Sequence, residues 1–292
     1  MSKDPLRAFA PSRELSIHAK AQRRKEPPPV SPPAPILRGK QLCLVLLALP
    51  LFFFNTTAPR AAAGASADRR APAVRIAIVG DSTVADYKPD DPHRGWGQLF
   101  PEFVVAGRVV VHNFAVNGRS TKTFKSEGRW EPVLEFEPNY IFIQFGHNDS
   151  HAKGRPEATD AATDYSDYLR EYVESARAQG ATPILVTPMH RGTWDKDGRH
   201  LTQELLPYAE AVRRVAREKR VPLVDLYALS ERAFERLGAE QLKTLFAVPE
   251  TDRTHFNERG ARLLAGLVAA ETARRVHALK KYLLPPHAPH GV

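Results

Sequence analysis

The stretch Val74-Arg75-Ile76-Ala77-Ile78-Val79-Gly80-Asp81-Ser82 decides the fold prediction. Its first six residues are mostly aliphatic and β-branched, which is typical of a strand buried on both faces. A glycine and two polar residues follow at once, as they do where a strand ends and a loop begins. The stretch therefore predicts a buried strand over residues 74–79, with a serine hydroxyl just beyond its carboxyl end.

Four later runs share the length and the aliphatic or aromatic content of a buried strand. They are Val109–Phe114, Tyr140–Phe145, Pro183–Thr187 and Pro222–Leu226. Segments with helical periodicity alternate with these runs. They are Tyr165–Gln179, which Gly180 ends, Gln203–Arg220 and Asn257–Lys280, with a weaker pattern over 96–105 that Pro101 interrupts. Strands that alternate with helices predict an α/β fold, a three-layer α/β/α sandwich around a five-stranded parallel sheet.

The chain divides into segments of different composition. Residues 1–40 are basic and proline-rich, which predicts a disordered leader. Residues 41–67 hold an apolar block at 42–54 followed by Ala65-Ser66-Ala67, the pattern of a signal peptide core and its cleavage site. Cleavage would give a secreted or periplasmic protein, whereas a retained block would anchor the chain in a membrane. Residues 68–283 predict one domain, and 284–292 predict a disordered tail.

Charge and cysteine content limit the class of protein further. The chain carries 42 Lys and Arg against 33 Asp and Glu, a net charge of +9. Residues 1–67 contribute ten basic and three acidic residues, so most of that charge belongs to the leader and signal peptide. We therefore expect no nucleic-acid partner for the domain. Cys43 is the single cysteine and lies in the apolar block, so the mature protein would lack disulfides and a cysteine nucleophile.

Side chains suited to nucleophilic catalysis follow the predicted strands. Ser82 comes just after the first strand, and Asp252 and His255 lie three residues apart before the last helix. A hydroxyl, an imidazole that takes its proton and a carboxylate that orients the imidazole make a serine hydrolase triad. Gly118 and Asn148 follow the second and third strands and could donate to an oxyanion, together with the backbone N–H of Ser82.

Each of these residues also has a structural interpretation. Ser82 could cap the segment after it, and Asp252 could cap a helix with His255 at the surface. Gly118 and Asn148 could be turn residues. The absence of a G-x-S-x-G sequence argues against an ordinary α/β-hydrolase. The catalytic interpretation requires these residues to meet at the carboxyl edge of the sheet, where ligands bind in such folds.

Four sequence blocks resemble those of SGNH (GDSL-type) hydrolases and occur in the same order. They are Gly80-Asp81-Ser82, the segment containing Asn117-Gly118, Gly146-His147-Asn148-Asp149, and Asp252-Arg253-Thr254-His255. The rhamnogalacturonan acetylesterase branch is resembled most closely, through Gly95-Trp96-Gly97, residues 118–124, residues 142–149 and Thr254-His255-Phe256-Asn257. The third strand opens with Asn139-Tyr140 where the family often has Gly-Asp, at a structural position.

The resemblance implies a flavodoxin-like SGNH hydrolase fold and a particular set of site residues. By this resemblance Ser82 is the nucleophile, His255 the base and Asp252 the group that orients it. The oxyanion hole would consist of Ser82, Gly118 and Asn148. The implied enzyme is a secreted serine esterase that needs no cofactor and removes O-acetyl groups from a cell-wall polysaccharide such as pectin, rhamnogalacturonan or xylan.

Other expectations concern substrate contacts and partners. Arg119, His147 and Trp194 are candidates for binding the acetylated polysaccharide or oligosaccharide. We predict no metal site, because His147 has no further ligands at matching spacing. We also predict a monomer without stable membrane association once the leader is cleaved. A lipase or lysophospholipase of the same fold and a non-catalytic carbohydrate-binding protein remain alternatives.

Overall fold

A computed structural model of the protein describes residues 73–285. The predicted leader and signal peptide, and the last seven residues of the predicted tail, lie outside these described residues. Within residues 73–285, no helix has the length and hydropathy needed to cross a bilayer.

The five predicted strands are all present and form one parallel sheet. The strands are β1 (Val74–Gly80), β2 (Val109–Asn113), β3 (Tyr140–Gln144), β4 (Thr182–Val186) and β5 (Leu223–Val224). Their order across the sheet is β2-β1-β3-β4-β5. Every neighbouring pair runs in parallel, so the predicted five-stranded parallel sheet is confirmed. Only the last strand is much shorter than the sequence predicts.

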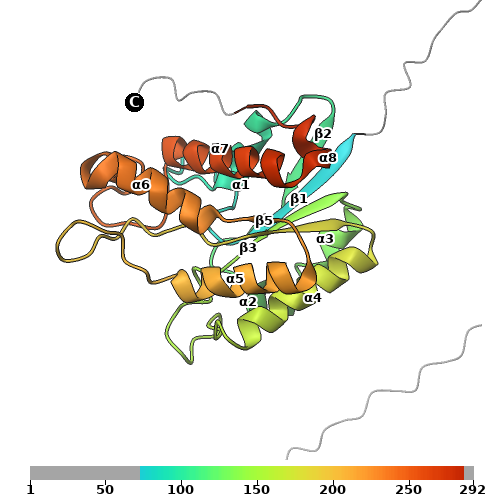
Figure 1. The fold of residues 1–292 in the computed structure, drawn as a ribbon, viewed down its shortest axis with the longest axis horizontal. Helices are drawn as coiled ribbons and strands as arrows, with labels where there is room; N and C mark the ends of the chain where they lie inside the picture. Colours follow the sequence, from blue (N-terminus) through green and yellow to red (C-terminus); the bar gives the residue numbers. More distant parts are fainter. Residues whose placement is uncertain (1–72, 286–292) are drawn as a thin grey trace, which may run out of the picture. The chain divides into compact units, whose positions relative to one another are not determined.

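Helices connect the strands and cover both faces of the sheet (Figure 1). They are α1 (Trp96–Leu99), the 3₁₀ helix η1 (Phe100–Phe103), α2 (Thr121–Ser126), α3 (Glu131–Glu135), α4 (Asp164–Ala178), α5 (Leu206–Lys219), α6 (Leu226–Lys243), α7 (Glu258–Arg275) and α8 (His277–Lys280). The long helix expected at the end of the domain is divided into α7 and α8 at Val276, which has non-helical backbone angles. The sequence analysis did not predict α2, α3 or α6.

The alternation of side chains along each strand builds two separate cores, one on each face. In β1, Ile76 and Ile78 pack with residues of α1, α6 and α7. Ala77 and Val79 point the other way and pack with α2, α4 and α5. These strand residues are fully buried. The continuous apolar run 74–79 therefore reflects a strand covered by helices on both sides.

Because all five strands are parallel, every loop that leaves the carboxyl end of a strand lies at the same edge of the sheet, called here the carboxyl edge. The loops after β1, β2 and β3 carry the residues at which catalysis is predicted, and the loop before α7 reaches the same edge. Two backbone contacts join these loops: the N–H of Val116 donates to the Gly80 carbonyl at 3.0 Å, and the N–H of Arg94 donates to the Phe256 carbonyl at 2.8 Å.

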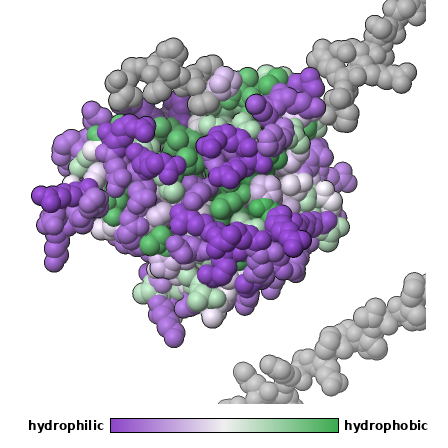
Figure 2. Space-filling view, viewed as in Figure 1, coloured by the Kyte–Doolittle hydropathy of each residue, from purple (hydrophilic) through white to green (hydrophobic). Residues whose placement is uncertain are grey.

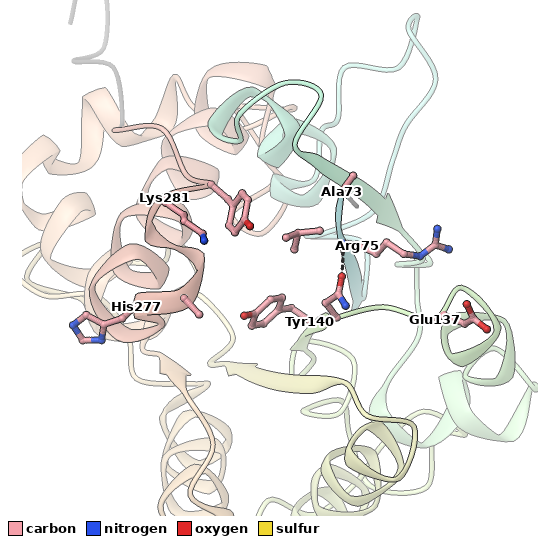
Figure 3. A pocket seen from close by; sticks show the side chains of 10 residues that line it. Ala73, Arg75, Glu137, Tyr140, His277 and Lys281 are labelled. Carbon is pink, nitrogen blue, oxygen red and sulfur yellow. Dashed lines mark hydrogen bonds between the residues drawn. The ribbon is translucent and has the colours of Figure 1, made fainter. Parts of the chain in front are cut away.

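The opposite, amino-terminal edge of the sheet holds a cavity of about 690 Å³. It is lined by the first residues of β1 and β3 and by α8 and the residues after it. Figure 3 shows that Arg75, Glu137 and His277 point outward from this cavity. Its lining includes none of the predicted catalytic residues, so the cavity is separate from the candidate active site.

Candidate active site

Ser82, His255 and Asp252 form a continuous chain of hydrogen-bonding groups. Ser82 Oγ lies 2.8 Å from His255 Nε2, and His255 Nδ1 lies 2.8 Å from Asp252 Oδ2. The imidazole is 33% exposed and the carboxylate 20% exposed. The three side chains therefore stand at the surface end of the site, in the arrangement that a serine nucleophile, a base and an orienting carboxylate require.

Buried hydrogen bonds hold the turn that presents Ser82. Asp81 Oδ1 accepts from the backbone N–H and the hydroxyl of Thr83, at 2.9 and 2.6 Å. The Thr83 hydroxyl in turn accepts from Gln144 Nε2 at 2.9 Å, and Trp96 Nε1 donates to Gln144 Oε1 at 2.8 Å. The network ties β1, β3 and α1 together directly behind the nucleophile. Ser82 is thus positioned by a connected set of buried side chains, in which Asp81 Oδ2 is the atom without a hydrogen-bond partner among the described residues.

The Gly95-Trp96-Gly97 motif lets α1 begin against this turn. A Cβ at Gly95 would lie 2.3 Å from the backbone carbon of Val84, and one at Gly97 would lie 2.6 Å from the Val84 carbonyl oxygen. Real Cβ atoms cannot approach backbone this closely, so only glycine fits at either position. The motif is therefore explained by close packing of α1 on the nucleophile turn.

A short loop delivers both Asp252 and His255. Asp252 Oδ1 accepts from the backbone N–H groups of Thr254 and His255 at 2.7 and 3.1 Å, leaving Oδ2 for the imidazole. Partial burial disfavours the charged carboxylate, but these hydrogen bonds outweigh it and the pKa of Asp252 lies below its ordinary value. Asn257 then caps α7 by accepting from Gly260. The loop therefore keeps Asp252 ionised and oriented toward His255.

The two predicted oxyanion donors come from adjacent loops. Gly118 has φ +76°, a conformation that favours glycine, and its Cβ position faces open space. Asn148 is largely buried, and its Nδ2 donates to the Arg119 carbonyl at 3.0 Å. This bond uses one of the two amide hydrogens, and the other remains available to an oxyanion. The structure thus brings the loop of Gly118 and the side chain of Asn148 together.

Comparison with known proteins fits this geometry. The profile of the GDSL-like Lipase/Acylhydrolase family matches residues 78–263. The chain belongs to this family. The match begins in β1, ahead of Ser82, and ends in α7, beyond His255, so all the candidate site residues lie inside it.

Curated relatives place this GDSL-family chain among esterases. Rhamnogalacturonan acetylesterase RhgT of Bacillus subtilis is 35% identical over 225 residues, covering 72% of this chain and 94% of the relative. The probable rhamnogalacturonan acetylesterase YesY of the same organism is 39% identical over 199 residues, covering 66% of this chain and 90% of the relative. The chain is accordingly a carboxylic ester hydrolase.

Solved structures confirm the SGNH-type α/β fold. The crystal structure of YxiM from Bacillus subtilis superimposes with a TM-score of 0.62 at 29% identity, covering 70% of this chain and 57% of that one. Axe2, an acetylxylan esterase from Geobacillus stearothermophilus, gives a TM-score of 0.53 at 20% identity, covering 68% of this chain and 93% of that one. At this identity the second likeness concerns the fold alone.

The structure corrects one of the substrate-contact predictions for this GDSL-family protein. His147 is 3% exposed, and its Nδ1 lies 3.6 Å from Asp81 Oδ2 beneath the nucleophile turn. Burial lowers the pKa of His147 and so favours the neutral imidazole. The prediction that His147 contacts substrate is therefore wrong, because a buried ring cannot reach a polysaccharide.

Arg119 and Trp194 remain nearer the surface than His147. The Arg119 guanidinium is 32% exposed and donates to Glu127 at 2.9 Å and to the Asn117 carbonyl at 2.9 Å. Trp194 is partly buried and packs on the core of the α7 face. Its backbone pairs with Leu201 across the loop after β4. Both side chains are thus held by the protein, and their contact with substrate stays a prediction.

Two residues that the sequence analysis missed also border the site. The Tyr87 hydroxyl donates to the Ser82 carbonyl at 2.8 Å. His93 stacks on Tyr87 with ring centroids 5.6 Å apart and meets His255 edge-on at 5.7 Å. No local motif marks these positions, because each reaches the triad only through the folding of the 83–94 loop.

Asp149, next to the predicted oxyanion donor Asn148, is a buried carboxyl group with an altered pKa. Burial raises its pKa to about 7, although hydrogen bonds from Thr121 and Thr159 oppose the change. Thr121 Oγ1 donates to its Oδ1 at 2.5 Å and Thr159 Oγ1 at 2.8 Å. The group thereby joins α2 to the start and the end of the loop between β3 and α4.

Asp149→Asn should flatten the pH dependence of stability. Because the pKa of Asp149 is higher in the folded state, its contribution is complete near pH 4 and is lost as the pH rises through about 7. At about 1.4 kcal/mol per pKa unit, the loss amounts to at most about 4 kcal/mol. The free energy of unfolding of both proteins, measured by urea titration from pH 4 to 8, gives the difference directly. If the free energies of unfolding of wild type and Asp149→Asn changed with pH in parallel, the raised pKa of Asp149 would be contradicted.

Proposed function

We propose that this protein is a secreted serine esterase that removes O-acetyl groups from a plant cell-wall polysaccharide, with acetylated rhamnogalacturonan as the first candidate. The observation that carries the proposal is the chain of contacts from Ser82 through His255 to Asp252. The family match supports ester hydrolysis as the reaction. The names of the two relatives at 35% and 39% identity support the substrate class.

In the proposed reaction, Ser82 Oγ attacks the acetyl carbonyl carbon while His255 Nε2 takes the hydroxyl proton. The tetrahedral oxyanion accepts hydrogen bonds from the backbone N–H groups of Ser82 and Gly118 and from the Asn148 amide. Collapse breaks the ester bond, and His255 returns the proton to the departing sugar oxygen. Water then attacks acetyl-Ser82 with His255 again as base, releasing acetate and the free serine.

The surface of the protein favours a hydrated substrate over a lipid. Among residues 73–285, Val110 and Val248 are the exposed large hydrophobic residues, and neither belongs to the site. Figure 2 shows that the face above α4–α7 is mostly hydrophilic. Long acyl chains require a continuous apolar surface. The scarcity of exposed large hydrophobic residues among residues 73–285 supports a short acetyl ester of a carbohydrate over a long-chain lipid ester.

Asn148→Ala should lower kcat by about 10²–10³-fold, the usual cost of removing one oxyanion donor. Because the amide acts on charge that develops in the transition state, KM should change little. Steady-state kinetics on a small acetyl ester would measure both constants. Asn117→Ala is the matched control, since Asn117 is exposed on the neighbouring loop. An effect confined to KM would contradict the assigned role.

The substrate assignment is tested by acetate release from acetylated rhamnogalacturonan, acetylated pectin and acetylated xylan, with Ser82→Ala in parallel. Serine-dependent release that is fastest on rhamnogalacturonan supports the proposal. Faster release from xylan would overturn the polymer assignment while keeping the reaction. Hydrolysis of long-chain lipid esters alone would favour a lipase, and no hydrolysis by the folded protein would favour a binding role.

A further inference from the structure

His93 stands beside the triad in a setting that resembles that of His255. Its Nδ1 lies 2.6 Å from Asp91 Oδ1, and the same oxygen accepts its backbone N–H at 2.9 Å. His255 is held similarly by Asp252, three residues before it, although Asp252 uses Oδ1 for the backbone N–H and Oδ2 for the ring. Each ring is therefore oriented through Nδ1 by a nearby carboxylate, which leaves Nε2 of His93 without a partner from Asp91.

The loop that carries His93 is fixed to the loop that carries His255. The Arg94 N–H donates to the Phe256 carbonyl at 2.8 Å in an antiparallel bridge. Beside this bridge the His93 and His255 rings meet edge-on, with their centroids 5.7 Å apart. The Arg94 guanidinium donates to the carbonyls of His93 at 2.6 Å and of Pro89 at 3.0 Å. Tyr87 stacks under the His93 ring. The bridge between the two loops and the ring contacts together hold the two imidazoles side by side.

We propose that His93, Asp252 and His255 form a transition-metal site whose occupation by an ion such as Zn²⁺ inhibits the esterase. One ligand atom from each residue lies within 4.8 Å of the other two. All three side chains are only partly buried, so an ion has access from solvent. The site shares Asp252 and His255 with the triad, but the proposed ester hydrolysis uses no bound ion.

The donor set selects the class of ion. Two imidazoles and one carboxylate suit Zn²⁺, Cu²⁺ or Ni²⁺, whereas Mg²⁺ and Ca²⁺ prefer oxygen ligands alone. Zn²⁺ holds nitrogen and oxygen ligands at about 2.0–2.2 Å, so small side-chain adjustments bring the three atoms into range. The Asp91 contact to His93 is the kind of outer carboxylate that orients metal-bound histidines.

Binding of the ion to either ring nitrogen of His255 would inhibit the esterase. An ion at Nε2 occupies the lone pair that takes the Ser82 proton. An ion at Nδ1 binds the tautomer in which the single ring proton has moved from Nδ1 to Nε2, where that proton prevents Nε2 from accepting the proton of Ser82. In both cases His255 ceases to be a base, so the bound ion stops acylation of Ser82.

The test compares inhibition by ZnCl₂ in the wild-type protein, His93→Gln and Asp91→Asn, each relative to its own uninhibited rate. We expect the inhibitory concentration to rise at least about tenfold in both variants, since loss of an outer-shell partner alone typically weakens metal binding by about 10–100-fold. His277→Gln, a histidine at the opposite edge of the sheet, is the control and should behave as wild type. MgCl₂ should not inhibit at the same concentrations.

Calorimetric titration of ZnCl₂ into Ser82→Ala provides a readout that does not depend on activity. One ion should bind per chain, and the double variant Ser82→Ala/His93→Gln should lose that binding. Equal inhibition of wild type and His93→Gln would overturn the proposal, as would absence of binding to Ser82→Ala. Because the titration needs no turnover, its outcome is independent of the substrate and of the proposed esterase activity.

Discussion

Ser82→Ala should lower kcat by about 10⁶-fold, the scale seen when a serine hydrolase loses its nucleophile. The Ser82 hydroxyl is the only group in the chain of contacts that can form the acyl-enzyme, and its partner His255 Nε2 lies 2.8 Å away. The residual rate would come from the oxyanion donors acting on water. The effect should fall on kcat, because the oxyanion donors and the substrate surface are unchanged.

The measurement is hydrolysis of a small acetyl ester by wild type and variant, with thermal unfolding of both. The Tm of Ser82→Ala should stay within a few degrees of the wild-type value. The buried hydrogen bonds of this turn join Asp81 and Thr83 and do not involve the serine hydroxyl. Ser126→Ala, at a helix end away from the site, serves as the matched control. Retention of more than a few per cent of activity in Ser82→Ala would rule out Ser82 as nucleophile.

Most of the fold could be predicted because its signal is local and repeated. Each strand is a short apolar run, and parallel strands covered on both faces give such runs by necessity. α6 escaped prediction because Gly238, which has φ +73°, interrupts it and because its buried positions are widely spaced. β5 is only Leu223–Val224, since the chain turns into α6 directly after it. Both departures concern one continuous segment, residues 223–243.

The candidate site was predictable where a role belongs to a short motif. The triad residues are in mutual contact, and the loops of both oxyanion candidates follow the carboxyl ends of neighbouring strands; the oxyanion role stays a prediction. His93 and Tyr87 were missed because their positions depend on the pairing of Arg94 with Phe256, two residues far apart in the chain. His147 was misread because its neighbour Asn148 turns its amide toward the Arg119 carbonyl, whereas the imidazole of His147 is buried toward Asp81. Adjacent residues in such a turn point in different directions.

Asp252→Asn should lower kcat by about 10⁴-fold while leaving the structure in place. The reason lies in how Asp252 uses its two oxygens. Oδ1 accepts the N–H groups of Thr254 and His255, so an asparagine must put its carbonyl oxygen there. Its NH₂ group then occupies the position of Oδ2 and donates to His255 Nδ1. The ring is forced to carry its proton on Nε2, where it can no longer accept the proton of Ser82.

Kinetics and spectroscopy together separate this tautomer effect from a loss of stability. The Tm of Asp252→Asn should stay close to that of wild type, because both backbone N–H groups keep their acceptor. The proton NMR signal of the His255 Nδ1–H, present in wild type through its 2.8 Å contact with Asp252, should disappear. Asp197→Asn, on an exposed loop, should leave kcat unchanged. A decrease in kcat of less than about tenfold in Asp252→Asn would mean that another group orients His255. His93, whose ring meets that of His255 edge-on, would then be the next residue to substitute.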